Sequence, residues 1–425
     1  MPARIRTPFR FAFLIAFAAA ASFAQAQEWT RFHGPNGSGE SETNFPAQTD
    51  KDKLKWKAEL PGYGHSSPVL WGDKIFLLSA DPKTAARYVL CLSAADGKEI
   101  WRREYPGVEH HLHGLSSYAS CTPAVDAKRV FVAWSDPDKT LLLALDHDGK
   151  DLWKKNFGPW VSQHGFGCSP MLYDDLVILS CSQEDPKRGG GGTPRASFVV
   201  AVEQASGEVR WQTPRKISNT SYSVPCIHKR ANGQDELICC STAEGIFSLN
   251  PKTGAENWSE DVFPLRTVSS PILVKNLVIG TTGQGSGSGN MLVAVSLEGE
   301  HKTVYENRKQ TPYVPTPVAQ GDLLFLWSDA GVVTCLVAAS GKVLWQEHVG
   351  GQFFGSPVRA GDKLFCVDTR GNLVCVAADR KFKKLGQTEL GETSHSVPAI
   401  AGGRMYVRTV SHLFAIDSEA AGQSN

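Results

Sequence analysis

Residues 202–211 read Val-Glu-Gln-Ala-Ser-Gly-Glu-Val-Arg-Trp, and residues 249–258 read Leu-Asn-Pro-Lys-Thr-Gly-Ala-Glu-Asn-Trp. In both segments a tryptophan stands four positions after a glycine. Glycine supplies the positive φ that a tight hairpin turn requires. The same spacing recurs where Gly97, Gly149 and Gly341 precede Trp101, Trp153 and Trp345. Each copy is therefore predicted to be a turn between two strands, the second of which carries the Trp.

A proline that opens a short apolar run forms a second repeated feature. The interval between successive prolines is roughly 40 to 55 residues, a period typical of repeat architectures. They are Pro68, Pro123, Pro170, Pro225, Pro271, Pro317, Pro357 and Pro398. Because Pro cannot donate to a strand ladder, it is tolerated on an edge strand, such as the innermost strand of a propeller blade. A period of this length holds four short strands, which is the content of one propeller blade. Each proline is therefore predicted to begin one blade.

These eight units predict an all-β fold, an eight-bladed β-propeller whose blades are four-stranded antiparallel sheets. The last blade begins at Ser396 and ends near Asp417 after only three strands. Residues 54–58, at the other end of the chain, supply the missing strand, so an N-terminal strand is predicted to close the ring. A seven-bladed ring is the alternative, and it requires one proline unit to be an insertion.

The tryptophans of the repeat are predicted to dock between neighbouring blades and to have a structural role. The set comprises Trp56, Trp101, Trp153, Trp211, Trp258 and Trp345. Two copies of the turn have drifted. Gly299 is followed by Thr303-Val304 in place of a tryptophan, and the turn near Lys381 is followed by Leu385.

Residues 1–26 have the pattern of a secretory signal peptide. Arg4, Arg6 and Arg10 precede an apolar stretch, and Ala24-Gln25-Ala26 offers a small-x-small cleavage site. An uncleaved N-terminal anchor is the alternative. Cleavage near Ala26 predicts a periplasmic or secreted protein. The expected segments are the signal peptide (1–26), an N-terminal extension (27–52), the propeller (53–417) and a C-terminal tail (418–425).

The composition is that of a globular chain with balanced charge. Its 425 residues include 44 Lys and Arg against 43 Asp and Glu. No long basic run is present, which argues against nucleic-acid binding. No apolar run of the mature chain reaches the ~18 residues needed to cross a bilayer, so no transmembrane segment is predicted there. We expect a monomeric propeller.

Ten cysteines lie in the exported part, where an oxidising compartment permits disulfides. Cys91, Cys335 and Cys375 occupy similar places in three repeats, which indicates a buried position for a small hydrophobic residue. Cys366 and Cys375 flank a turn at Arg370-Gly371. A two-residue turn would set them opposite each other, an arrangement that admits a cross-strand disulfide.

The segments at 202–211 and 249–258 resemble the tryptophan-docking repeat of PQQ-type propellers. That superfamily contains the outer-membrane assembly factor BamB and the quinoprotein alcohol dehydrogenases, and the resemblance covers about residues 53–417. The opening Trp29-Thr30-Arg31-Phe32-His33-Gly34-Pro35 is similar to the start of secreted PQQ-like repeat proteins. The resemblance implies the fold, but it says little about function because the docking Trp binds no cofactor.

For a dehydrogenase of this superfamily, the resemblance implies PQQ held over a Trp floor beside a vicinal-cysteine ring, with calcium and a catalytic Asp. Cys239-Cys240 is the only vicinal pair in the sequence, and residues 237–242 have the pattern of a strand. The following residues, 241–244, do not match the dehydrogenase motif. No Cys-x-x-Cys-His occurs for covalent haem. No cofactor is therefore expected, and PQQ with calcium is the alternative.

Three loops carry other candidate chemistry. Residues 109–113, Glu-His-His-Leu-His, bring together three imidazoles that could bind Zn or Cu; an ordinary polar loop or a lid over the channel are the alternatives. The glycine-rich stretches 189–192 and 283–289 lack the Lys-Ser/Thr of a phosphate loop and are predicted to be flexible excursions. No metal-binding and no catalytic residue is assigned.

The segments that lead into the inner strands gather on one face of a propeller. They bring together His65, Tyr118, His164, Tyr222, Arg266, Tyr313, Phe353, Phe354 and His395. Aromatic and imidazole groups around a concavity are typical of a ligand pocket or a docking surface. We predict that this channel mouth binds a ligand or partner through exposed side chains. The alternative is that these residues pack under neighbouring loops.

Three functional hypotheses follow. The first, which we favour, is a non-catalytic exported propeller, similar to BamB, that acts as a scaffold and binds an envelope protein or a small ligand. The second is an enzyme, a PQQ- and calcium-dependent quinoprotein oxidoreductase. The third is an enzyme with a metal at His110, His111 and His113.

Overall fold

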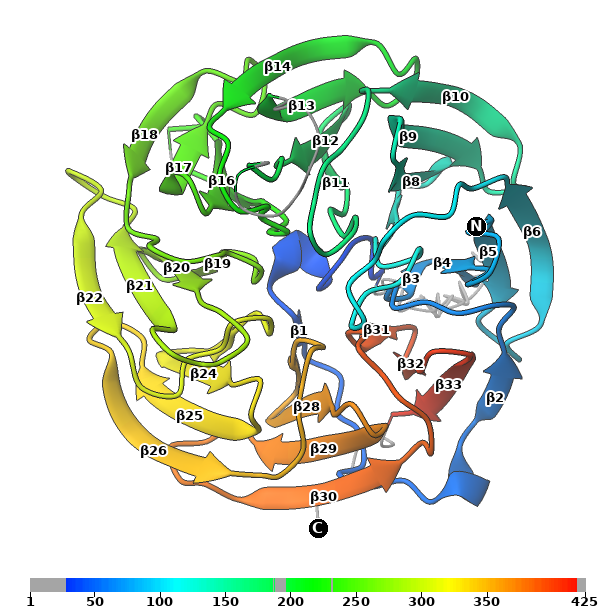
Figure 1. The fold of residues 1–425 in the computed structure, drawn as a ribbon. Coiled ribbons are helices and arrows are strands. Elements are labelled where there is room, and N and C mark those ends of the chain that lie inside the picture. Colours follow the sequence, from blue (N-terminus) through cyan, green and yellow to red (C-terminus); the bar gives the residue numbers. More distant parts are fainter. Residues whose placement is uncertain (1–27, 186, 188–195, 231, 419–425) are drawn as a thin grey trace, which may run out of the picture.

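In the computed structural model the strands form a closed ring of sheets around a central axis (Figure 1). The structure describes residues 28–185, 187, 196–230 and 232–418. Within them, eight sheets of four antiparallel strands follow one another around the ring, and one of these sheets gains a fifth strand. The prediction of an eight-bladed all-β propeller is confirmed. The predicted signal peptide and the glycine-rich stretch 189–192 lie outside the described residues.

The first four blades run from the inner to the outer strand in chain order. Blade 1 contains β3 (Val69–Trp71), β4 (Lys74–Ala80), β5 (Arg87–Ser93) and β6 (Glu99–Tyr105). Blade 2 contains β7 (Ala124–Val125), β8 (Arg129–Asp136), β9 (Lys139–Asp146) and β10 (Asp151–Asn156). Blade 3 contains β11 (Met171–Tyr173), β12 (Leu176–Cys181), β13 (Ser197–Glu203) and β14 (Val209–Arg215). Blade 4 contains β15 (Cys226–His228), β16 (Glu236–Ser241), β17 (Gly245–Leu249) and β18 (Glu256–Glu260).

The remaining blades follow the same order except at the closure. Blade 5 contains β19 (Ile272–Val274), β20 (Leu277–Thr282), β21 (Met291–Ser296) and β22 (Thr303–Asn307). Blade 6 contains β23 (Val318–Gln320), β24 (Leu323–Trp327), β25 (Val332–Val337) and β26 (Lys342–His348). Blade 7 contains β27 (Val358–Ala360), β28 (Lys363–Val367), β29 (Asn372–Ala377) and β30 (Lys384–Glu389). Blade 8 contains β31 (Ala399–Ala401), β32 (Arg404–Arg408), β33 (His412–Asp417) and the N-terminal β2 (Trp56–Glu59).

The N-terminal segment closes the ring. β2 pairs antiparallel with β33, with Trp56 opposite Ala415, so the two ends of the chain share blade 8 as predicted. Upstream of β2 the chain has two short 3-10 turns, η1 (Pro35–Gly37) and η2 (Lys51–Lys53). It also has one short strand, β1 (Glu40–Ser41), which joins the inner edge of blade 7 parallel to β27. No helix of the described ranges is long and apolar enough to cross a membrane.

Each repeated proline stands directly before the inner strand of its blade, and the residue before it links the blades. The backbone N–H of Ser67 donates to the hydroxyl of Thr122 (3.0 Å), and that of Thr122 donates to Ser169 (2.9 Å). Equivalent bonds run around most of the ring: Val224 to Ser270, Ser270 to Thr316, Thr316 to Ser356 and Val397 to Ser67. These hydroxyls explain why the sequence places Ser or Thr before six of the eight prolines: each one satisfies a buried N–H of the neighbouring blade. We call these hydroxyls before the repeated prolines the hydroxyl belt. Val224 and Val397 interrupt it because their side chains have no oxygen to accept a hydrogen bond.

The belt gives a direct test of its energetic value, since Val and Thr have nearly the same shape. Thr316→Val should destabilise the fold by about 1–3 kcal/mol, because the buried N–H of Ser270 loses its acceptor. Val224→Thr, the matched reverse change, should stabilise it by about 1 kcal/mol. Urea denaturation measures both changes. Equal stabilities of the two variants would show that the belt contributes nothing.

Most of the repeat tryptophans donate a hydrogen bond to the next blade. Each indole N–H of Trp101, Trp153 and Trp211 donates to a backbone carbonyl of the next blade at 2.9 Å. A Cβ placed on Gly207 would stand 2.6 Å from the Trp153 ring, so the turn glycines give the preceding indole room as well as supplying a positive φ. In the drifted fifth repeat Tyr305 takes the place of the Trp and donates to the carbonyl of Ala338 at 2.7 Å.

Trp258 docks differently from the others. Its indole N–H donates to Glu236 of its own blade at 3.2 Å, and its ring stacks on His301 of blade 5 with centroids 4.6 Å apart. The residue before the docking position, such as Leu152 in blade 2, is a β-bulge in seven blades. These bulges interrupt the regular hydrogen-bonding pattern of the outer edge strands. An irregular edge strand pairs less readily with a strand of another chain.

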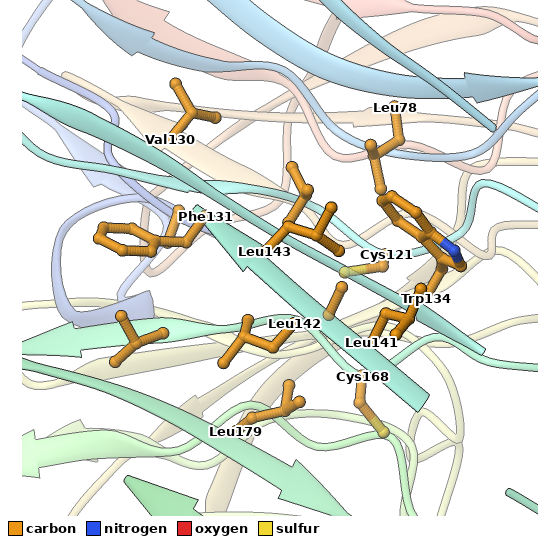
Figure 2. Close-up of a cluster of buried hydrophobic side chains, with 14 of the residues drawn as sticks. Leu78, Cys121, Val130, Phe131, Trp134, Leu141, Leu142, Leu143, Cys168 and Leu179 are labelled. Atoms are coloured by element: carbon orange, nitrogen blue, oxygen red, sulfur yellow. The ribbon is translucent and has the colours of Figure 1, made fainter. Parts of the chain in front are cut away.

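The core lies between the blades. Figure 2 shows the side chains of blade 2, including Leu142 and Leu143 of β9, between Leu78 of blade 1 and Leu179 of blade 3. All of these side chains are buried. Because each sheet is covered on both faces by its neighbours, the middle strands are nearly continuous apolar runs.

The cysteines belong to this core. All ten are buried, and the predicted buried position is confirmed at Cys91, Cys335 and Cys375. The Cys366–Cys375 disulfide that the sequence left open does not form. The β28–β29 loop is longer than two residues, which pairs Cys366 with Val374 and Cys375 with Phe365. This one-residue offset sends the two sulfur atoms to opposite faces of the sheet.

Candidate functional site

The N-terminal extension crosses one end of the central channel (Figure 1). It contacts the inner strands of several blades around the ring. The guanidinium of Arg31 donates to the carbonyl of Pro225 in blade 4 at 2.8 Å. The ring of His33 lies 2.8 Å from the carbonyl of Pro357 in blade 7. Backbone carbonyls of Trp29 and Thr30 accept from Leu70 in blade 1 and Val125 in blade 2. The extension therefore ties blades together from inside the ring.

A cavity of about 1200 Å³ occupies the channel on the side where the lead-in segments gather. Of the residues predicted at the channel mouth, it is lined by His65, His164, Tyr222, Arg266, Tyr313, Phe354 and His395. Phe32 of the extension also contributes to the wall. The ring thus forms a chamber whose mouth is built from residues far apart in the sequence.

Two residues predicted at the mouth are placed elsewhere. Phe353 is fully buried and packs edge-on against Trp327, with centroids 5.2 Å apart. Its neighbour Phe354 faces the cavity because successive side chains of an extended chain point in opposite directions. Tyr118 donates its hydroxyl proton to the carbonyl of His110 at 2.8 Å and covers the guanidinium of Arg87. It supports a loop and does not line the cavity.

Four histidines form two pairs on the cavity wall. His65 stacks on His395 with centroids 4.3 Å apart, and His113 meets His164 edge-on at 4.5 Å. Burial, together with His395 and Arg408, holds the pKa of His65 well below its usual range. Burial and the nearby Arg266 lower the pKa of His164 to about 4. His65 and His164 are therefore neutral at pH 7 and act as flat, weakly polar groups.

Arg266 is held by an ion pair behind the wall. Only 8% of this residue is exposed, and its Nη2 donates to both carboxylate oxygens of Glu184 at 3.0 and 3.3 Å. Glu184 is 1% exposed and also accepts from the backbone N–H of Thr220. The prediction that Arg266 is an exposed mouth residue is wrong, because this buried carboxylate draws the guanidinium inward.

The loop at 109–113 lies beside the cavity, but its imidazoles point to different partners. The ring of His110 lies 2.8 Å from the carbonyl of Val108, while His113 accepts from the N–H of Leu115 and contacts His164. No group of three or more His, Cys, Asp or Glu side chains that could hold a metal ion occurs in the part of the chain that the structure describes. The geometry does not support a metal enzyme at this loop.

The residues present do not fit a quinone site of the kind implied by the resemblance. Cys239 and Cys240 lie in β16 opposite Phe247 and Ile246, and their side chains belong to two separate core clusters. Among the described residues the cavity lining contains no Trp, and Asp329 is its one carboxylate. That carboxylate accepts the backbone N–H groups of Tyr313 and Val314. Within the described ranges, this cavity therefore has no Trp floor and no vicinal-cysteine ring at its wall.

Sequence reasoning missed the acidic residues that organise the wall. Glu184 lies just after β12, and Asp329 lies just after β24, the second strand of each blade. Acidic residues recur near this position: Asp136 pairs with Arg87, and Glu244 pairs with Arg215 at 2.8 Å. The recurrence of an acidic residue near this position is the sequence pattern from which Glu184 and Asp329 could have been predicted.

A family model and a curated relative with the same description both match this chain. A family model described as outer membrane protein assembly factor BamB matches residues 85–347 and 330–423. The BamB protein of Burkholderia pseudomallei is 23% identical over 379 residues, which cover 86% of this chain and 88% of that protein.

Enzymes are also among the similar proteins. Tetrathionate hydrolase of Acidithiobacillus ferrooxidans is 25% identical over 247 residues, a match that covers 55% of this chain but only 44% of the hydrolase. The structure of a europium-containing methanol dehydrogenase superposes with a TM-score of 0.67 at 14% identity and covers 91% of this chain and 90% of that one. At that identity the superposition reports the fold alone.

Proposed function

Because this chain belongs to the PQQ-repeat propeller family described as outer membrane protein assembly factor BamB, we propose that it is an exported, non-catalytic binding protein of the cell envelope. Its partner docks at the channel mouth, in the cavity walled by His164, Tyr222, Tyr313, Phe354 and His395. The signal-peptide pattern at 1–26 supports export, and the domain boundaries predicted from the sequence belong to this proposal.

One observation carries the proposal: the cavity is large, yet the carboxylates at its wall are already engaged. Glu184 is paired with Arg266, and Asp329 accepts two backbone N–H groups. Burial keeps His164 neutral by lowering its pKa to about 4. A general base or nucleophile would need an available group with a matched pKa. The wall instead offers aromatic faces, hydroxyls and amides, which suit recognition.

Site-specific photo-crosslinking in the native host tests where the partner docks. A photoreactive residue at Gln352, which is exposed and lines the cavity, should give a discrete adduct with an envelope protein. Lys342 is an exposed control on the outer strand of blade 6, away from the cavity lining, and should give none. Adducts from Lys342 alone would place the binding surface on the blade rim and contradict the proposal.

The competing oxidoreductase is tested by titrating the purified protein with PQQ and calcium. A bound cofactor raises the melting temperature, because a ligand at one hundred times its Kd stabilises the folded state by ~2.7 kcal/mol. The binding-protein proposal predicts no such shift and no dye reduction with alcohols. A saturable shift that requires both PQQ and calcium would favour the oxidoreductase.

A further inference from the structure

One corner of the cavity, between blades 5 and 6, is built from three segments that contact one another. They are Arg266 before β19, the loop 283–290 between β20 and β21, and residues 308–313 between β22 and β23. The backbone N–H of Gly283 donates to the carbonyl of Arg266 at 2.8 Å. The amide of Asn290 reaches the carbonyl of Thr311 at 3.5 Å. We call this group of residues the blade 5–6 corner.

Hydrogen-bond donors in this corner lack acceptors. Thr311 lines the cavity and is only 3% exposed, yet its hydroxyl forms no hydrogen bond among the described residues. The ammonium of Lys309 forms no ion pair with any described carboxylate. Arg266 uses Nη2 on Glu184, whereas its buried Nε donates no hydrogen bond within the described part of the chain. Buried donors without partners are rare and require an explanation.

The wall itself does not supply the missing acceptors. Both oxygens of Asp329 are occupied by the N–H groups of Tyr313 and Val314. The third cation of the lining, Arg308, is matched by Glu306 at 2.8 Å, and Glu306 does not line the cavity. Among the described residues, the corner therefore contains one cation without an ion-pair partner, Lys309, and the unbonded hydroxyl of Thr311.

We propose that the blade 5–6 corner binds the carboxylates of an acidic, extended segment of the partner protein. Side-chain oxygens of that segment accept from Lys309 and Thr311 and so supply the acceptors that the wall lacks. The planar amides of Asn219, Gln284, Gln310, Gln346 and Gln352 line the same cavity and match the N–H and C=O groups of a peptide backbone. This inference rests on the proposed function, since it assigns the chemistry of the segment that the channel mouth binds.

Fluorescence anisotropy with labelled peptides tests the inference. The probe is a peptide with three consecutive glutamates, compared with the same peptide carrying glutamines and with inorganic phosphate as competitor. The glutamate peptide should bind at least tenfold more tightly than the glutamine peptide, and its affinity should fall as salt is added. Lys309→Gln should weaken it about tenfold, and Thr311→Val about fivefold.

Lys302→Gln is the matched control. It removes the same charge from blade 5, at a surface lysine 3.2 Å from Glu260 and outside the cavity lining, so it should leave the affinity unchanged. Thr311→Val also checks folding, because it replaces an unbonded hydroxyl by a methyl group and should keep the melting temperature.

The outcomes separate this inference from the proposed function. Equal affinity for the glutamate and glutamine peptides would show that the bound segment need not be acidic, while the channel mouth would remain the peptide site. If Lys309→Gln and Lys302→Gln weaken peptide binding equally, the blade 5–6 corner is not the binding site. Competition by phosphate at lower concentration than the glutamate peptide would replace the carboxylate with a phosphate group. Crosslinks at Gln352 with no peptide binding would likewise overturn the inference while the proposed function stands.

Discussion

Deletion of residues 28–60 is expected to abolish the folded propeller and not merely to shorten it. The deletion removes β2, the outer strand of blade 8, together with the docking of Trp56 on blade 1. It also removes Trp29 and Phe45, which are 1% and 0% exposed. Loss of a buried Trp or Phe costs ~3–5 kcal/mol each, against a total stability of ~5–15 kcal/mol. Circular dichroism and urea denaturation should show no cooperative transition.

A shorter deletion separates the two roles of this segment. Removal of residues 28–47 keeps β2 and the closure of blade 8 but takes away the buried Trp29 and the bonds that Arg31 and His33 make across the channel. This variant should still unfold cooperatively, at a clearly lower urea midpoint. An unchanged midpoint for the longer deletion would refute closure by the N-terminal strand.

Arg266→Ala should destabilise the protein by about 3–5 kcal/mol, although the residue lines a cavity. The change leaves the carboxylate of Glu184 buried without its cationic partner, and an unpaired buried charge is far more costly than a missing surface contact. Thermal denaturation measures the effect directly. A loss below about 0.5 kcal/mol, the range of ordinary surface changes, would show that Glu184 is not dependent on Arg266.

Two further variants isolate the cause of that loss. The double change Arg266→Met with Glu184→Gln removes both charges and should recover most of the stability. Tyr313→Phe removes a hydroxyl from the same part of the wall and should change stability by less than about 1 kcal/mol, because Tyr313 is only partly buried. If the double variant is no more stable than Arg266→Ala, packing rather than charge explains the loss.

The sequence by itself determined the blades. Proline has no N–H to donate, so each repeated proline marks the start of an inner edge strand such as β3 or β19. Glycine at the turn before five of the docking tryptophans adopts a positive φ, as at Gly97 and Gly207. These are properties of single residues and their neighbours along the chain. The number of blades and the closure by β2 could therefore be predicted without coordinates.

The same local patterns failed where a loop length or a side-chain direction decided the outcome. A longer loop than expected between β28 and β29 turned Cys366 and Cys375 to opposite faces. One position along the chain separates buried Phe353 from Phe354 at the cavity wall. A shift of one residue reverses the face of an extended chain, and the sequence pattern does not resolve such a shift.

Only the tertiary structure decided the chemistry of the cavity. Arg266 meets Glu184 across 82 positions of sequence, and His33 reaches Pro357 across 324. Such pairs form because closure of the ring brings distant blades to one axis. Burial at that axis lowers the pKa of His65, and it also makes a hydrogen-bond donor without an acceptor costly. Local sequence encodes backbone conformation, whereas burial and pairing are properties of the closed ring.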